Sequence, residues 1–336
     1  MVKSAFSNLI GQAQAVTLLQ GAIATNRIAP AYLFAGPPGV GRSIAARVFI
    51  ELLFCQGIPV EKQLLIKKRL EQGNHPDLLW IEPTYLHNGN LLSAQEATEK
   101  GLKRRAPPQI RLEQIREIAQ FLSRSPLEAP SKVVVLEQAE TMAEAAANGL
   151  LKTLEEPGTA TLILIAPSPE SLLPTLVSRC QRIPFYRLAL SDLEVVLQQA
   201  GYAELLQESS VLAMAQGSPG QAIACFQQLQ AIPHSLLTQL TQVPQTPRRA
   251  LELAKEIDKT LDTEAQLWLT DYLQHCYWQS QHQSVIVQQL EQARQYLLSY
   301  AQPRLVWEVT LLKLRALSHS HGYKRVGFRN QTEIAG

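Results

Sequence analysis

The stretch AYLFAGPPGVGRS at residues 31–43 decides the fold. Its first five residues are apolar and do not alternate with polar ones, which is typical of a central parallel strand. Gly36, Gly39 and Gly41 then allow backbone N–H groups to converge on an anion, and the helix-forming segment 44–54 presents its positive end to the same place. Strand, loop and helix together predict a phosphate-binding P-loop.

One residue of this loop departs from the P-loop pattern. The pattern has Lys before its Ser or Thr, whereas Arg42 precedes Ser43 here. Lys carries a compact charge on a flexible stem and Arg a planar fork, so the exchange is not conservative at a phosphate site. Whether the site still turns over a nucleotide depends on the rest of the chain.

The length, net charge and cysteine positions of the chain narrow the kinds of protein it can be. A chain of 336 residues suggests two or three domains. A net charge of +2 leaves DNA binding to a local patch, for which Lys103, Arg104 and Arg105 are the candidate and a solvated loop the plainer interpretation. No apolar run is long enough to predict a membrane span. The four cysteines form no C-x-x-C pair, which predicts neither a zinc site nor disulfides and favours a reducing cytoplasm.

Strand and helix patterns alternate up to residue 186, which predicts a parallel α/β sheet. A first helix is expected over 6–27, and an irregular surface insertion over 85–108. Beyond residue 186 only helical patterns follow, the last strong one beginning at Pro303. Five strands are expected, at residues 31–35, 77–81, 132–140, 161–166 and 181–185.

Five segments in this order and spacing resemble the clamp-loader subunits of bacterial DNA polymerase III, which are AAA+ proteins. The resemblance is strong over residues 1–230 and rests on size and pattern alone in the C-terminal helices. Its most specific part is AAANGLLKTLEEP. The segments are GPPGVGRS (36–43), HPD (75–77), AAANGLLKTLEEP (145–157), LPTLVSRCQ (173–181) and GSPGQA (217–222).

The resemblance implies an AAA+ fold in three parts and a tail. A P-loop domain with a five-stranded parallel sheet is expected over 1–186, and a small helical lid over 187–231. A helical collar over 232–320 is expected to pack against homologous collars in a hetero-oligomer. Residues 321–336 are expected to be a polar tail.

The resemblance also implies a nucleotide site that has degenerated. Glu137 stands where a magnesium-holding Asp is expected, and magnesium demands tight octahedral geometry. Gln138 replaces an acid that orients or deprotonates water, and a carboxamide cannot serve as that base. Gly220 falls where a lid arginine is expected, and Ala166 or Ser168 where a polar sensor is expected. The implied vestigial site, which leaves residual ATP or ADP binding open and holds no metal, consists of Gly36, Gly39, Gly41, Arg42, Ser43 and Glu137.

The motif Ser178-Arg179-Cys180 is intact. An arginine supplied in trans raises the rate of phosphoryl transfer by about 10³–10⁵. A chain that has lost its own site but kept this motif resembles the delta-prime subunits of the family. Arg179 is then expected to reach the γ-phosphate bound by a neighbouring ATPase subunit, whereas the plainer interpretation is a surface arginine near a helix end.

The partners implied are gamma- or tau-type ATPase subunits and delta-type subunits, with the sliding clamp and primed DNA reached through the complex. Relatives often carry four cysteines in a zinc-binding insert, of which only Cys55 remains, so no zinc is expected. Two alternatives stay open. One is an ATP-hydrolysing motor-type subunit or another AAA+ ATPase in which Arg42 replaces the lysine, and the other is a scaffold without chemistry in trans.

Overall fold

The computed structural model describes residues 5–100, 107–156, 158–282 and 284–320. The chain divides into two compact units, Met1–Gln207 with Ala215–Ile223, and Glu208–Met214 with Ala224–Gly336. The division into lid and collar predicted from the sequence stays a prediction. The basic cluster 103–105 and the tail 321–336 lie outside the described residues.

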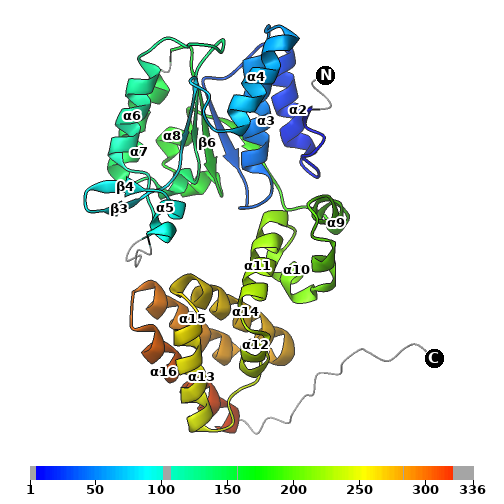
Figure 1. The fold of residues 1–336 in the computed structure, drawn as a ribbon, viewed down its shortest axis with the longest axis vertical. Helices are drawn as coiled ribbons and strands as arrows, with labels where there is room; N and C mark the ends of the chain where they lie inside the picture. Colours follow the sequence, from blue (N-terminus) through cyan, green and yellow to red (C-terminus); the bar gives the residue numbers. More distant parts are fainter. Residues whose placement is uncertain (1–4, 101–106, 157, 283, 321–336) are drawn as a thin grey trace, which may run out of the picture. The chain divides into compact units, whose positions relative to one another are not determined.

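A five-stranded sheet forms the centre of the first unit (Figure 1). Its order is β2-β5-β6-β1-β7, and every neighbouring pair is parallel, which confirms the predicted sheet. The three middle strands are buried along their whole length, as expected from their unbroken apolar sequences. The strands are β1 (Ala31–Ala35), β2 (Leu78–Ile81), β5 (Val133–Leu136), β6 (Thr161–Ala166) and β7 (Gln181–Pro184).

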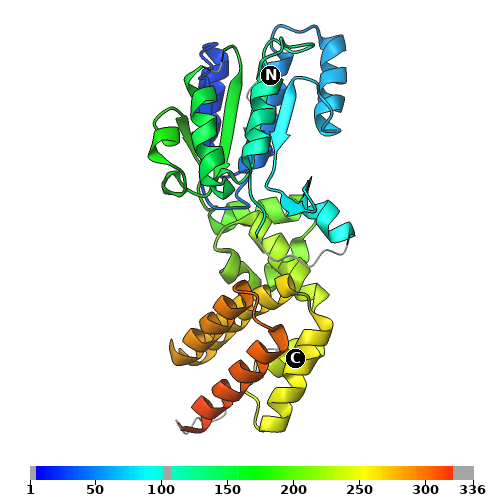
Figure 2. The same cartoon turned by 90° about the vertical axis from the view of Figure 1, so that its left-hand side faces the viewer.

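Helices cover both faces of this sheet (Figures 1 and 2). On one face the ring of Tyr32 meets that of Phe49 edge-on, with centroids 5.2 Å apart. On the other face Ile118, Leu150 and Leu176 join the apolar cluster beneath the strands. The first face carries α2 (Ala13–Ala24) and α3 (Arg42–Cys55), and the second α6 (Leu112–Leu122), α7 (Glu144–Glu155) and α8 (Pro174–Val177).

The structure corrects the expected elements in four places. The strand expected over 132–140 covers only Val133–Leu136, because the chain turns into a 3-10 helix at Ala139–Thr141. The first long helix, α2, begins at Ala13 instead of residue 6. A helix not expected from the sequence, α4, follows α3, and Ile66 is its one fully buried residue. The region expected to be irregular contains a hairpin and a short helix. The remaining elements of this unit are α4 (Val60–Glu71), β3 (Tyr85–His87), β4 (Asn90–Leu92), α5 (Ala94–Glu99), η1 (Ala139–Thr141), η2 (Pro169–Ser171), α9 (Leu190–Gln199) and η3 (Ala203–Gln207).

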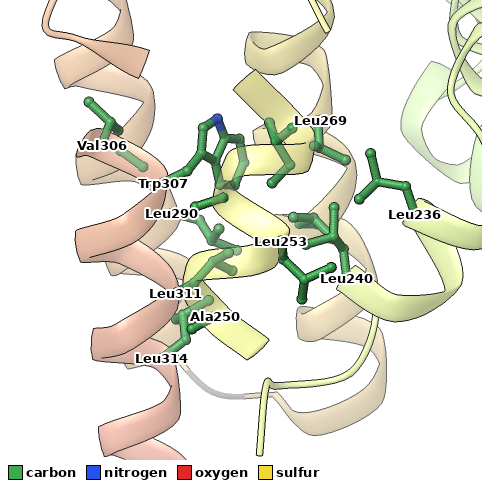
Figure 3. Packing of buried hydrophobic residues seen from close by; sticks show 14 of the residues in the cluster. Leu236, Leu240, Ala250, Leu253, Leu269, Leu290, Val306, Trp307, Leu311 and Leu314 are labelled. Carbon is green, nitrogen blue, oxygen red and sulfur yellow. The ribbon is translucent and has the colours of Figure 1, made fainter. Parts of the chain in front are cut away.

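The second unit is helical, as predicted, and α16 begins at Pro303 as expected. Figure 3 shows the buried apolar side chains of its core, among them Trp307. Trp307 is fully buried in its core, and the indole N–H donates to Gln266 Oε1 at 2.9 Å. Tyr277 OH donates to the carbonyl oxygen of Leu240 at 2.8 Å, so these buried polar groups are satisfied. Its helices are α12 (His234–Leu240), α13 (Pro247–Thr260), α14 (Thr263–Gln281), α15 (Ser284–Leu298) and α16 (Pro303–Ser320), with parts of α10 (Ser209–Ala215) and α11 (Pro219–Ala231).

Across the described ranges, none of the helices combines the length and apolar character that a membrane crossing requires.

Candidate functional site

The loop between β1 and α3 has the backbone geometry of a phosphate loop. Gly39 and Gly41 have φ angles of 76° and 103°, which side chains other than glycine rarely adopt. Gly41 directly precedes α3, so the N-terminus of this helix faces the loop. A Cβ on Gly36 would lie 2.3 Å from the carbonyl oxygen of Phe185, so this position also requires glycine.

The structure brings Ser43 and Glu137 together at the end of β5. Ser43 Oγ donates a hydrogen bond to Glu137 Oε1 at 2.8 Å. Burial raises the pKa of Glu137, while the bond from Ser43 and the charge of Arg42 act in the opposite direction. In a working P-loop this hydroxyl contacts magnesium. Here the hydroxyl is bound to the carboxylate that replaces the expected aspartate.

Arg42 is buried beside this pair, with 8 % of its surface exposed. Burial lowers the pKa of its guanidinium, and the carboxylates of Glu137 and Glu140 partly oppose that shift. Among the described residues, neither Arg42 Nη1 nor Glu140 Oε2 has a hydrogen-bond partner. Unpaired buried donors are costly, and a free guanidinium N–H at a helix N-terminus is a group that binds anions.

The start of α11 packs directly on the loop. Gly220 N donates to Gly39 O at 2.9 Å, and Ser218 Oγ donates to Pro38 O at 2.7 Å. A Cβ on Gly220 would lie 2.8 Å from Gly39 Cα. Position 220 therefore has glycine because two backbones meet there, and the arginine expected by analogy has no room in this arrangement.

This contact predicts that Gly220→Ala destabilises the first unit. The added methyl group must displace either the loop or α11, at a cost of about 1–3 kcal/mol. Gly21→Ala is the matched control, because a Cβ there meets no described heavy atom within 4 Å and Gly21 lies inside α2. The control should gain up to about 1 kcal/mol from helix propensity. Urea unfolding and amide exchange at Gly220 measure both effects, and wild-type stability with unchanged exchange in Gly220→Ala would contradict the prediction.

Gln12 belongs to this site but was not identified from the sequence. It is 2 % exposed, and its Nε2 donates to Tyr186 O at 2.7 Å and to Val40 O at 3.2 Å. Tyr186 N donates back to Gln12 Oε1 at 3.0 Å. One side chain thus joins the first segment, the P-loop and the end of the sheet. No local sequence signal predicts these hydrogen bonds.

The remaining expected positions of the nucleotide site are dispersed. Ala166 lies at the end of β6, and its carbonyl oxygen accepts from Gly36 N at 3.2 Å. The backbone N–H of Glu170 and then the side chain of Ser168 hydrogen-bond the exposed Glu170 carboxyl group and lower its pKa. Gln138 is exposed and has a φ angle of 50°. Of these residues, the structure brings Ala166 against the P-loop.

Arg179 lies in the turn after α8, with 37 % of its side chain exposed. Its Nη1 donates to Thr175 O at 2.9 Å, and its Nη2 to Glu155 Oε1 at 2.8 Å. Ser178 Oγ also donates to Thr175 O, at 3.1 Å. Cys180 packs against the apolar cluster beneath the sheet, where burial raises the pKa of its thiol to about 11. The thiol is therefore protonated at neutral pH, and Cys180 anchors the turn that presents Arg179.

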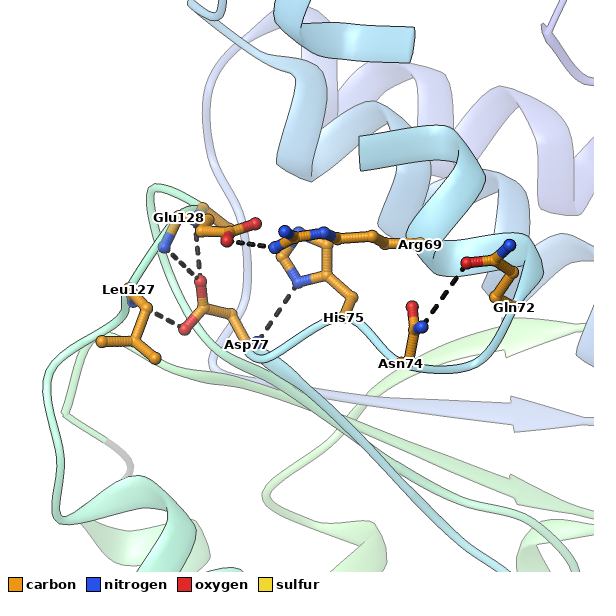
Figure 4. Close-up of polar contacts among 8 residues, drawn as sticks. Arg69, Gln72, Asn74, His75, Asp77, Leu127 and Glu128 are labelled. Carbon is orange, nitrogen blue, oxygen red and sulfur yellow. Dashed lines mark hydrogen bonds and ion pairs between the residues drawn. The ribbon is translucent and has the colours of Figure 1, made fainter. Parts of the chain in front are cut away.

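The HPD segment forms a separate buried network (Figure 4). Asp77 is fully buried, and its carboxylate accepts the N–H groups of Leu127, Glu128 and Ala129 at 2.7, 2.7 and 2.8 Å. Burial alone would raise the pKa of Asp77, but these three donors together bring it below its ordinary value. The carboxylate thus fixes the loop that leads into β5.

His75 completes this network through its ring nitrogen and its flat face. Its Nδ1 accepts the backbone N–H of Asp77 at 3.2 Å, which assigns the proton to Nε2. The ring lies against Phe54 at a centroid distance of 4.6 Å, and burial lowers the pKa of His75. Next to it, Arg69 forms an ion pair with Glu128. The HPD motif therefore has a structural role.

Within the described residues, no three His, Cys, Asp or Glu side chains gather in a group that could hold a metal ion.

Two family models match the chain in succession. The model described as "DNA polymerase III, delta subunit" matches residues 11–189. The model described as "Cyanobacterial DNA polymerase III delta prime, C-terminal domain" matches residues 191–314. Together they extend over both compact units.

Similar proteins agree with these matches. The chain is 33% identical over 186 residues to DNA polymerase III subunit delta' of Bacillus subtilis, covering 54% of this chain and 50% of that protein. It is 35% identical over 199 residues to subunit delta' of Pseudomonas aeruginosa, covering 57% and 54%. It is also 27% identical over 221 residues to subunit tau of Bacillus subtilis, covering 64% and 35%. The matched parts thus span about half or less of these relatives.

A solved structure shares the fold. A DNA polymerase III gamma subunit-related protein from Thermotoga maritima superimposes with a TM-score of 0.54 at 19% identity, covering 90% of this chain and 99% of that one. At this identity the match shows the fold alone, and it agrees with the AAA+ architecture of a P-loop domain followed by helices. With the first family model matching more than half of its residues, the chain belongs to the DNA polymerase III delta subunit family, and within it to the delta-prime type.

Proposed function

We propose that this chain is a subunit of a DNA polymerase III clamp loader that supplies Arg179 in trans to the ATP of a neighbouring subunit and hydrolyses ATP poorly itself. The observation that carries the proposal is a contrast within the first unit. Arg179 is presented on an exposed turn anchored by Cys180. At the chain's own P-loop, Ser43 is bonded to Glu137.

The proposed action of Arg179 is electrostatic. Phosphoryl transfer needs positioning and stabilisation of charge on the equatorial oxygens more than covalent chemistry. A guanidinium fork stabilises that charge through two parallel N–H bonds, which a lysine cannot make. Ser178 and Cys180 act as positioning residues, since one bonds the turn's carbonyl group and the other anchors the turn in the core.

The chain's own loop is proposed to be vestigial. Its hydroxyl is bonded to Glu137, whose pKa is raised by burial, and the next residue is Gln138 in place of a base. At the position expected for a lid arginine, Gly220 contacts the loop through its backbone alone. The loop glycines and the unpaired Nη1 of Arg42 retain donors for a phosphate. We therefore propose that any ATP or ADP bound here is held without turnover.

The proposed partners are gamma- or tau-type ATPase subunits and a delta-type subunit, with the sliding clamp and primed DNA reached through the complex. The helical region 232–320 is proposed as the collar that joins them, and 187–231 as the lid. Exposed apolar side chains on α15 and α16 support this, because Tyr296, Leu305 and Val309 line a groove of about 220 Å³.

The purified chain alone tests the statement about its own site. With ATP and magnesium we expect no turnover above that of a protein-free blank, and no change on Glu137→Ala. Isothermal titration with ATP measures binding separately from turnover. Magnesium-dependent hydrolysis that Glu137→Ala abolishes would contradict the proposal.

That contrary result would favour the second candidate, an ATP-hydrolysing motor-type subunit in which Arg42 replaces the lysine. The similarity to a tau subunit over 221 residues supports this second candidate function. One substitution distinguishes the two candidate functions. Arg42→Ala should abolish ATP turnover if the chain is a motor-type subunit, and should leave the complex active if the chain is of the delta-prime type.

A further inference from the structure

We propose that Glu155 is the resting partner of Arg179, a carboxylate that competes with the neighbour's phosphate for the same guanidinium. This inference rests on the proposed function. Arg179 Nη2 donates to Glu155 Oε1 at 2.8 Å, in an ion pair whose side chains are 37 % and 52 % exposed. The pair joins the last residue of α7 to the turn after α8.

The position of Glu155 is unfavourable for its own helix. The C-terminal end of a helix carries partial negative charge and favours cations, as Lys152 in the same last turn illustrates. A carboxylate at the final position of α7 repels that end. The positive charge of Arg179 offsets this repulsion. Glu155 therefore destabilises its own helix end but is compensated by the ion pair.

The ion pair involves the same guanidinium group that would act on the neighbour's phosphate as an arginine finger. Nη1 is bonded to Thr175 O and Nη2 to Glu155, so both outer nitrogens of the fork already have acceptors within the chain. A phosphate needs the fork in a bidentate arrangement. The negative charge of Glu155 would also repel the phosphate and neutralise the guanidinium. Because each outer nitrogen carries two N–H groups, Glu155 competes with the phosphate through its charge, and Arg179 offers its full charge only after it leaves Glu155.

The competition between Glu155 and the phosphate makes the availability of Arg179 depend on whether the ion pair is formed. While the pair is formed, only a fraction of the chains present a free guanidinium, and the apparent affinity of the finger for its target falls by that fraction. Exposed pairs of this kind are weak, so a multiply charged phosphate displaces the carboxylate, whereas weaker acceptors do not. Glu155 thus lowers the fraction of chains in which Arg179 is free, and a nucleotide in the neighbouring site shifts that balance toward the free side chain.

The test is ATP turnover by the reconstituted complex carrying Glu155→Gln, which keeps the side-chain shape and removes the charge. We expect kcat/KM for ATP to rise about two- to five-fold, the range set by a weak exposed pair. The rise should be absent in the double variant with Arg179→Ala, and should shrink as salt screens the pair. Glu156→Gln is the matched control, since it removes the next carboxylate and leaves the pair intact, and it should match the wild type.

The outcomes separate the two proposals. If Arg179→Ala is active like the wild type, the proposed function fails and this inference fails with it. If Arg179→Ala is defective but Glu155→Gln has unchanged or lower kcat/KM, the finger stands and competition by Glu155 is wrong. A lower value would make Glu155 a residue that positions the guanidinium.

Discussion

Replacing Arg179 by alanine is expected to lower ATP turnover at the neighbouring subunit's site by about 10³ or more, the range in which arginine fingers act. The loss is specific to chemistry in trans, because the side chain is exposed and its ion pair with Glu155 contributes little to folding. Single-turnover hydrolysis by the reconstituted complex measures it as the loss of one kinetic phase.

Two further variants sharpen this experiment. Arg179→Lys keeps the charge but cannot form two parallel N–H bonds, so it should recover only a small part of the rate. Arg182→Ala removes another exposed arginine three positions along the chain and should leave the phase intact. Equal turnover in the Arg179→Ala complex and the wild type would reject the finger.

Replacing Asp77 by alanine is expected to destabilise the first unit by about 2–5 kcal/mol. The carboxylate accepts three backbone N–H groups from 127–129, and its removal leaves donors in a buried region without an acceptor. Asp77→Asn retains one acceptor oxygen and the side-chain volume, so its loss should be smaller. Urea unfolding at neutral pH measures both variants.

The pH dependence gives an independent check on Asp77. Its pKa is lower in the folded chain than in the unfolded one, so its ionisation stabilises the fold at pH values above the unfolded-state pKa of about 3.9. That contribution is lost as the pH falls through the folded-state value. The difference in unfolding free energy between wild type and Asp77→Ala should therefore be constant near neutral pH and shrink in acid. A difference below about 0.5 kcal/mol at neutral pH, within the range of ordinary surface substitutions, would contradict the role given to this carboxylate.

The sheet and the P-loop could be predicted because their signals are local. Residues 31–43 carry an unbroken apolar run followed by glycines, and Gly39 and Gly41 are required by their own positive φ angles. The middle strands β5 and β6 follow the same rule of uniform burial, whereas the edge strands β2 and β7 are only partly buried. Helix α4 was missed because little of it is buried, so its sequence has only a weak apolar face.

The parts of the site that escaped prediction depend on contacts between distant segments. Gln12 bonds the backbone of Tyr186, 174 positions away. The backbones of Gly220 and Gly39 are in close contact, so position 220 requires glycine for steric reasons. Comparison with relatives that carry an arginine there does not predict this contact. Glu155 belongs to the motif at residues 145–157, but its ion pair with Arg179 depends on the packing of α7 against α8 and could not be predicted from that motif.

A single comparison tests the central statement that this chain acts on another subunit's ATP and not on its own. Two complexes are reconstituted, one with Arg179→Ala and one with Ser43→Ala, which removes the hydroxyl of the chain's own loop. We expect the Arg179→Ala complex to lose a phase of ATP turnover and the Ser43→Ala complex to keep the wild-type rate. A loss in the Ser43→Ala complex with normal turnover in the Arg179→Ala complex would contradict it.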